Sequence, residues 1–279
     1  MRRAVFCLPP ITHMPTPDRA SHPAQRAIRP LLKVPEITAY FWIVKLLSTA
    51  MGESTSDFLV FQINPYIAVV LGCLGLAVAL LLQLWLRQYV AWIYWLAVVM
   101  VAVFGTMAAD VTHVVMGIPY LVSTVFFACA LAIIFTTWYA TEKTLSIHSV
   151  CAGRRELFYW STVIATFALG TAAGDMTAST LGLGYFPSLV LFVVLFALPA
   201  LAYWRFGLNE IVAFWFAYVV TRPLGASFAD WLGKPYLGGL GLGDQKVAPI
   251  LTILIIGLVG YLTVSGADVR GESRAAASP

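Results

Sequence analysis

Apolar residues are grouped along the chain into long runs, which short polar or basic links separate. Each run has roughly the 20 residues that a helix needs to cross the hydrocarbon core of a bilayer. The eight runs cover residues 36–58, 66–86, 90–112, 119–139, 156–178, 187–205, 209–231 and 247–265. This pattern predicts an all-α, polytopic membrane domain of eight transmembrane helices over residues 33–265.

The two ends of the chain differ from this domain in character. Residues 1–32 are rich in proline, histidine and arginine, and residues 266–279 are small and polar. Segments of this kind do not bury enough apolar surface to offset the entropy of folding. We therefore expect a flexible tail at each end.

Composition and charge placement support a membrane protein. Hydrophobic residues make up 60% of the 279 residues and charged residues 11%, whereas about 25% of a typical soluble domain is charged. Arginine and lysine gather on one set of links, and the opposite set holds only Lys234 and Lys246. The positive-inside rule then places both termini in the cytoplasm. Because the net charge of +4 comes from links and tails, it does not indicate nucleic-acid binding.

The odd-numbered runs share a motif at fixed spacing. Residues 41–57, 94–110, 159–175 and 214–230 align without gaps, and each contains a tryptophan, then a glycine, then an aspartate. The motif residues are Trp42, Trp95, Trp160 and Trp215; Gly52, Gly105, Gly170 and Gly225; and Asp57, Asp110, Asp175 and Asp230. Agreement at three positions in four segments indicates an internal repeat.

Each repeat is a pair of helices. A proline lies at or near the start of every even run, where a helix tolerates it because the first amide has no partner. Two crossings return the chain to the same side, so the repeats are parallel and related by an axis along the membrane normal. We expect four repeats around a pseudo-symmetric core, with the odd helices at the centre and the aspartates at one depth. Their approximate bounds are 36–87, 88–140, 155–206 and 207–265.

The Trp, Gly and Asp motif resembles that of a bacterial family of membrane proteins built from four tandem copies of a two-helix repeat of unknown function. The resemblance covers about residues 31–265. It implies this fold and a location in the bacterial inner membrane. Since it implies no established activity, the functional hypothesis has to come from the charged residues.

Charged side chains within membrane spans are costly and usually face the protein interior or a wet cavity. The acidic residues there are Glu53, Asp57, Asp110, Asp175 and Asp230, and the basic residues are Lys45 and Arg222. If all are ionised, five acids exceed two bases by three charges. Four carboxylates at one depth would form a ring that attracts cations. Oxygen ligands favour hard ions such as Mg²⁺, Mn²⁺ and Ca²⁺.

The leading hypothesis is a secondary transporter or exporter of a cation, with a divalent metal favoured and coupling to protons. The four aspartates would coordinate the ion, Glu53 would carry the coupling proton, and Lys45 and Arg222 would neutralise or gate the empty site. Two alternatives stay open: a non-transporting scaffold or accessory subunit with structural aspartates, and a cation channel. We expect no enzyme activity, because no hydrolase motif occurs. The expected partners are the bilayer and a metal ion or proton, with no cofactor.

Two local features receive weaker interpretations. His113 lies three residues after Asp110, which is a possible metal-ligand spacing, but no other repeat has a histidine there. A solvated loop position is therefore expected for His113. Residues 239–244 are glycine-rich but lack the strand and the Lys-Ser/Thr pair of a phosphate-binding loop, so they predict a flexible loop.

Overall fold

The computed structural model describes residues 32–269 of the chain. Over this range the fold is all-helical, as the sequence predicts, apart from one isolated bridge between Leu32 and Cys151. The expected tails, residues 1–32 and 266–279, lie mostly outside the described residues. Their described parts are Leu32 and residues 266–269.

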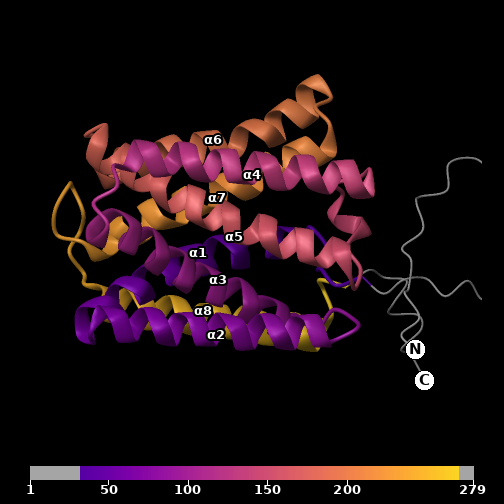
Figure 1. Cartoon of the computed structure of the whole chain (residues 1–279), viewed down its shortest axis with the longest axis horizontal. Helices are drawn as coiled ribbons and strands as arrows, with labels where there is room; N and C mark the ends of the chain where they lie inside the picture. The colour runs from indigo at the N-terminus through magenta and orange to yellow at the C-terminus, as the bar shows by residue number, and fades with distance from the viewer. Residues whose placement is uncertain (1–31, 270–279) are drawn as a thin grey trace, which may run out of the picture.

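Eight long helices correspond to the eight apolar runs (Figure 1). They are α1 Ala39–Gln62, α2 Pro65–Trp85, α3 Ala91–Asp110, α4 Tyr120–Glu142, α5 Arg154–Asp175, α6 Tyr185–Phe206, α7 Glu210–Gly233 and α8 Asp244–Ser265. Two π-helical turns, η1 Val111–Val115 and η3 Met176–Thr180, extend α3 and α5, and a short 3-10 turn, η2 Ile147–Ser149, precedes α5.

Seven of the described helices, α2 to α8, are long and apolar enough to cross a membrane. The protein is therefore a multi-pass integral membrane protein. The first helix, α1, is long enough to cross a membrane but is less apolar than the other seven. It carries Lys45, Glu53 and Asp57 together with several serines and threonines. Its charged residues are buried within the bundle.

The long helices form two layers around an axis. In the inner ring α1 contacts α3, α3 contacts α5, α5 contacts α7, and α7 contacts α1. Each even-numbered helix packs outside the odd-numbered helix of the following repeat: α2 on α3, α4 on α5 and α6 on α7. The last helix, α8, packs on α1 and so completes the circle.

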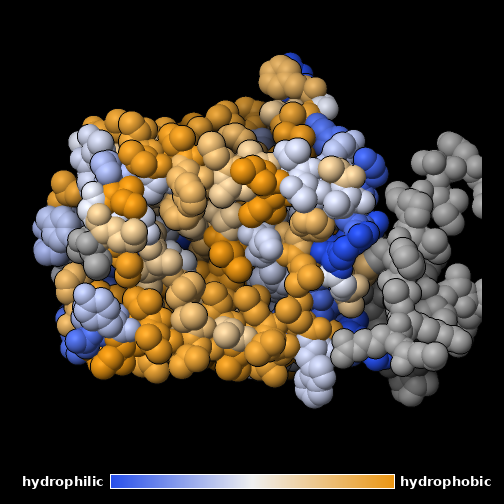
Figure 2. All heavy atoms as spheres, in the orientation of Figure 1, coloured by the Kyte–Doolittle hydropathy of each residue, from blue (hydrophilic) through white to orange (hydrophobic). Residues whose placement is uncertain are grey.

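The two layers differ in burial. Trp95 of α3, Tyr159 of α5 and Tyr218 of α7 are among the largest fully or almost fully buried side chains. The outer helices instead expose large apolar side chains such as Leu71 and Phe126. Figure 2 shows hydrophobic residues across the middle of the molecule, with hydrophilic residues gathered toward its ends. An outer layer of this kind suits contact with lipid tails.

The motif glycines let neighbouring inner helices approach closely. A Cβ added at any of them would lie no more than 3.1 Å from a side chain of the next repeat in the ring. The pairs are Gly52 with Ala102, Gly105 with Phe167, Gly170 with Arg222 and Gly225 with Thr49. Each partner lies three residues before the glycine of its own repeat. Small residues at helix contacts are typical of membrane bundles, and here the same contact is made four times in a closed cycle.

The described ends of the chain meet at the end of the bundle that carries the motif tryptophans. The buried ammonium of Lys33 donates to Gln83 O at 2.6 Å and lies 2.6 Å from Glu156 Oε1. The Glu36 amide donates to Asp268 O at 3.0 Å. Residues 266–269, which the sequence assigned to a flexible tail, are thus tied to the bundle.

Candidate cation-binding site

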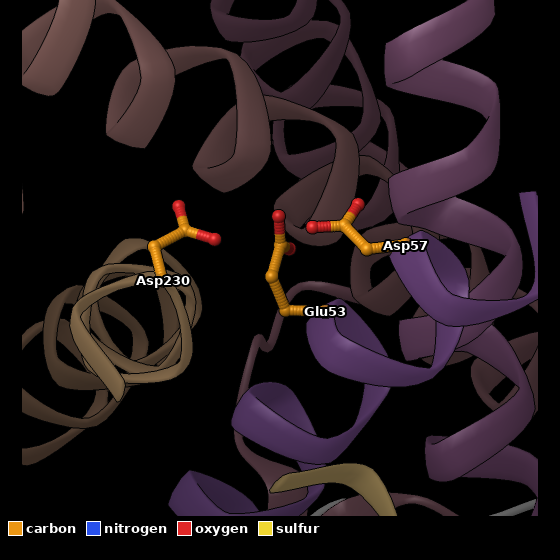
Figure 3. Close-up of side chains that lie close together, drawn as sticks. All are labelled: Glu53, Asp57 and Asp230. Atoms are coloured by element: carbon orange, nitrogen blue, oxygen red, sulfur yellow. The ribbon is translucent and has the colours of Figure 1, made fainter. Parts of the chain in front are cut away.

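Three carboxylates converge at the end of the inner ring opposite the motif tryptophans. Glu53 and Asp57 come from successive turns of α1, and Asp230 comes from α7. Figure 3 shows the three side chains pointing toward one another across the space between these helices. One oxygen of each lies within 4.8 Å of the others. This geometry brings together hard oxygen ligands of the kind that divalent cations prefer.

Lys234, whose sequence position predicts a place in a link between helices, lies within this cluster. Lys234 directly follows α7, and its Nζ lies 2.9 Å from Asp57 Oδ2 and 2.8 Å from Asp230 Oδ1. Burial alone would lower the pKa of Lys234, but the carboxylates of Asp230, Asp57 and Glu53 outweigh it and hold that pKa well above its usual value. The ammonium therefore stays charged at neutral pH. The signal that was overlooked is the spacing of Asp230 and Lys234, which are four residues apart on one helical face.

The glycine-rich segment holds Lys234 in place. Amides of residues 240–243 donate to the last carbonyls of α7: Leu240 N to Trp231 O at 2.6 Å, Leu242 N to Leu232 O at 2.9 Å and Gly243 N to Gly233 O at 3.0 Å. These bonds satisfy carbonyls that a helix end leaves unpaired. The segment is therefore an ordered cap on α7, in contrast to the flexible loop that the sequence predicts.

Arg222 lies deeper in the ring and pairs with Glu53. Its Nη2 donates to Glu53 Oε2 at 2.6 Å and to Thr171 Oγ1 at 2.8 Å, and it also donates to Thr106 Oγ1. Glu53, Thr106 and Thr171 each directly follow the motif glycine of their repeat. Arg222 of the fourth repeat thus donates hydrogen bonds to the residue that follows the motif glycine in each of the other three repeats. Arg222 is expected from the sequence to neutralise or gate the empty site, and in the structure the acid that it neutralises is Glu53.

Lys45 lies apart from the carboxylates. Its Nζ sits 4.0 Å from the ring centroid of Phe167 and 4.3 Å from that of Tyr218. The side chain is buried, and Nζ has no hydrogen-bond partner among residues 32–269. Aromatic faces offer an ammonium a weaker interaction than a carboxylate does. Lys45 therefore does not serve as the counter-ion of the carboxylates in this structure.

Asp110 and Asp175 form the other side of the aspartate ring. Both are only partly buried, and neither side chain makes a hydrogen bond or ion pair within the described part of the chain. Both end an α-helix and are followed at once by a π turn, η1 or η3. Turns of this type frequently accompany functional sites. The structure thus brings Asp57, Asp230 and Glu53 together and leaves Asp110 and Asp175 unpaired beside them.

The cluster as a whole is acidic. It contains the five carboxylates named above and two cations, Arg222 and Lys234, which leaves three negative charges in excess if all are ionised. His113 does not join it: Nδ1 lies 3.2 Å from Ile118 O, and the ring lies 4.2 Å from that of Tyr120. His113 is also buried, and not the solvated loop residue that the sequence suggests.

The chain matches a family described as a Repeat of Unknown Function (DUF347). It occurs four times, at residues 40–89, 93–144, 158–208 and 213–268. No curated protein and no solved structure matches the chain. The four matches together span most of the sequence and contain the motif tryptophans, glycines and aspartates. The resemblance noted in the sequence is thereby confirmed, and the chain belongs to the DUF347 repeat family.

Proposed function

We propose that this protein is a secondary transporter of a cation in the bacterial inner membrane, with a divalent metal favoured and protons as the coupling ion. The observation that carries the proposal is the position of Lys234. Its ammonium bridges Asp57 and Asp230 beside Glu53, where a bound metal ion would find three carboxylate ligands. A protein cation in a carboxylate cluster is a natural competitor for an external one.

The proposal includes α1 as an eighth membrane span. α1 has 24 residues and is surrounded by α3, α7 and α8, so its charged residues need not meet lipid. Arg87, Arg154 and Arg205 lie at the end of the bundle where the described chain ends meet, which supports cytoplasmic termini. The carboxylate cluster then lies toward the opposite face of the membrane.

Access to the site is one-sided in this arrangement. Below the carboxylates, the ring is filled by Arg222, Phe167 and Tyr218, all of them almost completely buried. Above them, Asp110 and Asp175 are partly exposed. A cation would therefore enter past Asp110 and Asp175 and reach Asp57 and Asp230 as Lys234 withdraws.

Exchange follows from the charges. The cluster holds an excess of three negative charges if all groups are ionised, so a divalent ion can enter even while Lys234 stays protonated nearby. Protons compete for the same carboxylates, because protonation also reduces the repulsion among them. Binding of metal and of protons would then exclude one another, which is the basis of coupled exchange. Glu53, held by Arg222, serves as a fixed ligand in this scheme in place of the proton carrier that the sequence suggested.

A second candidate is a membrane scaffold or accessory subunit in which the aspartates are structural. The ion pairs of Lys234 favour it, because they already give Asp57 and Asp230 a partner from the protein. Asp110 and Asp175 distinguish the two functions. A structural role requires a protein partner for each carboxylate, and neither side chain has one within the described residues. A structural role predicts no ion flux at all.

The test is flux into proteoliposomes of the purified full chain, using Mn²⁺, Mg²⁺, Ca²⁺, Co²⁺ and Na⁺ in turn, with a pH dye inside. We expect movement of one divalent ion with opposite movement of protons. The Asp110→Asn/Asp175→Asn double variant should lose it while keeping its gel-filtration profile. Glu142→Gln, an acid at the opposite end of the bundle from the cluster, is the matched control. Absence of flux in the wild type, or full flux in the double variant, would contradict the proposal.

A further inference from the structure

A carboxylate outside the cluster, that of Asp244, lies close to Lys234. Asp244 is the first residue of α8, and the residue before it, Gly243, donates its amide to Gly233 O at 3.0 Å. A Cβ added at Gly233 would lie 2.6 Å from Asp244 Oδ1. The carboxylate of Asp244 is therefore packed against the end of α7, beside the backbone of the residue that precedes Lys234.

The carboxylate of Asp244 has no cation at ion-pair distance among residues 32–269, since Lys234 binds Asp57 and Asp230 instead. The charges of Lys234 and Glu53 nevertheless act on it, and its polar neighbours include the hydroxyl of Ser54. Asp244 is half-buried, whereas Asp57 and Asp230 are at most 8% exposed. Lys234 thus occupies the two deeper carboxylates and leaves the one nearer the surface.

The fourth repeat is the one that contains both of these residues. Counted from the motif glycine, the other repeats have Phe61, Val114 and Ser179 in the place of Lys234. The helices α2, α4 and α6 have no acid in their first turn, whereas α8 begins with Asp244. An acid in the first turn also stabilises a helix through its dipole. That stabilisation requires a carboxylate at the start of α8 but not one beside Lys234.

The backbone around Lys234 is fixed, but its side chain is not enclosed. Lys234 N donates to Asp230 O at 2.9 Å, and Lys234 O accepts from Gly241 N at 3.1 Å. The side chain of Lys234 is 16% exposed, and lysine carries its charge at the end of a flexible four-carbon stem. Rotation about side-chain bonds can therefore move the ammonium while both helices stay in place.

We propose that Asp244 is a positioning residue, which receives the ammonium of Lys234 when a divalent cation takes its place between Asp57 and Asp230. This inference rests on the proposed transport function. The ammonium keeps its proton and exchanges two buried carboxylates for the one at the start of α8. Without that acceptor it would stay beside a doubly charged ion at low dielectric constant, where like charges repel strongly. Asp244 thereby strengthens metal binding without contacting the metal.

The test is isothermal titration calorimetry of the detergent-purified full chain with Mn²⁺, Mg²⁺ and Ca²⁺ in turn. Four proteins form a double-mutant cycle: the wild type, Asp244→Asn, Lys234→Met and the double variant. Asparagine keeps the size of the side chain and is well accepted at helix starts. Glu210→Gln removes an acid from the first turn of α7, at the opposite end of the bundle, and is the matched control.

We expect Asp244→Asn to weaken metal binding about fivefold, the upper range of a surface ion pair, because the displaced ammonium loses its acceptor. In the Lys234→Met background the same substitution should change the affinity by no more than about twofold, as for independent sites. Glu210→Gln should bind metal like the wild type. Equal weakening in both backgrounds would identify Asp244 as a metal ligand or a structural residue and would overturn the proposal.

A second measurement follows the ammonium itself. With metal bound, Lys234 should react faster with a water-soluble acylating reagent, because Asp244 lies nearer the surface than Asp57 and Asp230 do. The exposed Lys246 is the internal reference for peptide mass spectrometry. Unchanged reactivity of Lys234 would also overturn the proposal. If no metal binds the wild type, the transport function fails as well; if metal binds but the two backgrounds agree, the role of Asp244 alone is refuted.

Discussion

The two halves of the aspartate ring come from the same motif but have different surroundings. Asp57 and Asp230 are buried and share the ammonium of Lys234. Asp110 and Asp175 are partly exposed, make no ion pair within the described residues, and each precedes a π turn. The repeat fixes where the four carboxylates stand. Residues outside the motif decide which of them are neutralised.

The layer next to the motif glycines shows the same division. Repeats 1 and 4 supply the charged pair Glu53 and Arg222, whereas repeats 2 and 3 supply the hydroxyls of Thr106 and Thr171. Repeats 1 and 4, the charged half, are thus joined by an ion pair, and the threonine hydroxyls of repeats 2 and 3 accept hydrogen bonds from Arg222. The four repeats thus form a site with two unlike sides. On the closed side, protein cations neutralise Asp57 and Asp230, and on the open side, Asp110 and Asp175 make no ion pair among the described residues.

The largest effect on stability is expected from removing the guanidinium of Arg222, which lies at the centre of the charged half. Arg222→Met leaves the carboxylate of Glu53 buried without a counter-ion, which should cost about 3–5 kcal/mol of stability. Thermal unfolding in detergent measures it. Adding Glu53→Gln in the same chain should recover much of the loss, because no unpaired charge then remains. A double variant no more stable than Arg222→Met would show that Arg222 acts through packing alone.

Removal of the Lys234 ammonium should leave the two carboxylates of the closed side free to bind an added cation. Lys234→Met leaves Asp57 and Asp230 without their shared cation and should cost about 1–3 kcal/mol. A divalent cation should then raise the melting temperature of the variant more than that of the wild type. Lys246→Met, at an exposed lysine, is the control and should respond like the wild type. Equal responses in all three proteins would exclude competition between Lys234 and a metal.

The pH dependence of this difference has a definite sign. The pKa of Lys234 is raised in the folded protein, so its contribution is complete below the unfolded pKa of about 10.4. It is lost only as the pH rises through the still higher folded value. The stability gap between wild type and Lys234→Met should therefore stay level from neutral pH to about pH 10. A gap that already shrinks between pH 7 and pH 9 would contradict the assigned ion pairs.

The glycine contacts sharpen the comparison at the level of packing. A Cβ at Gly170 would lie 2.5 Å from Arg222, and one at Gly105 would lie 3.1 Å from Phe167. Gly170→Ala should therefore cost about 1–3 kcal/mol through overpacking. For Gly105→Ala the gain in helix propensity, about 1 kcal/mol, offsets most of a smaller strain. Gly257→Ala, with open space around it, is the control and should not destabilise. Equal losses at positions 105 and 170 would refute this ranking.

The smallest effect on stability is expected in the open half. Asp110→Asn and Asp175→Asn remove no bond to the described protein, so each should change stability by no more than about 0.5 kcal/mol. Asp230→Asn removes half of the Lys234 clamp and should cost more. Chemical unfolding curves of the three variants give the comparison. If the asparagine at 110 or 175 destabilises as much as that at 230, the open half is structural too.

The sequence predicts the fold well because the fold depends on patterns that repeat. Apolar runs of the right length, a glycine at each inner contact and an aspartate five residues later recur in four copies. The family match at all four repeats confirms this frame. The sequence alone does not reveal that each even-numbered helix packs on the next repeat, because that depends on how helices close in space.

The site could be predicted only in part. The carboxylates were identifiable as charges in apolar runs, but their partners lie far away in the sequence, as with Arg222 and Glu53. Lys234 was missed because it lies just beyond the apolar run, where lysine usually faces water. Lys45 was expected to oppose an acid and instead lies against Phe167 and Tyr218, since the ring brings aromatic residues to that depth.

The circular packing of the repeats has a consequence for connectivity. Because α8 packs on α1 as α2 packs on α3, the fold has no intrinsic first repeat. The described ends are also adjacent, with the Glu36 amide bonded to Asp268 O. A circular permutant that joins residues 32 and 269 by a short linker and begins anew in the link after α4 keeps every inter-repeat contact. By the same geometry, two half-length chains of two repeats each, paired head to tail, would build this ring from separate polypeptides.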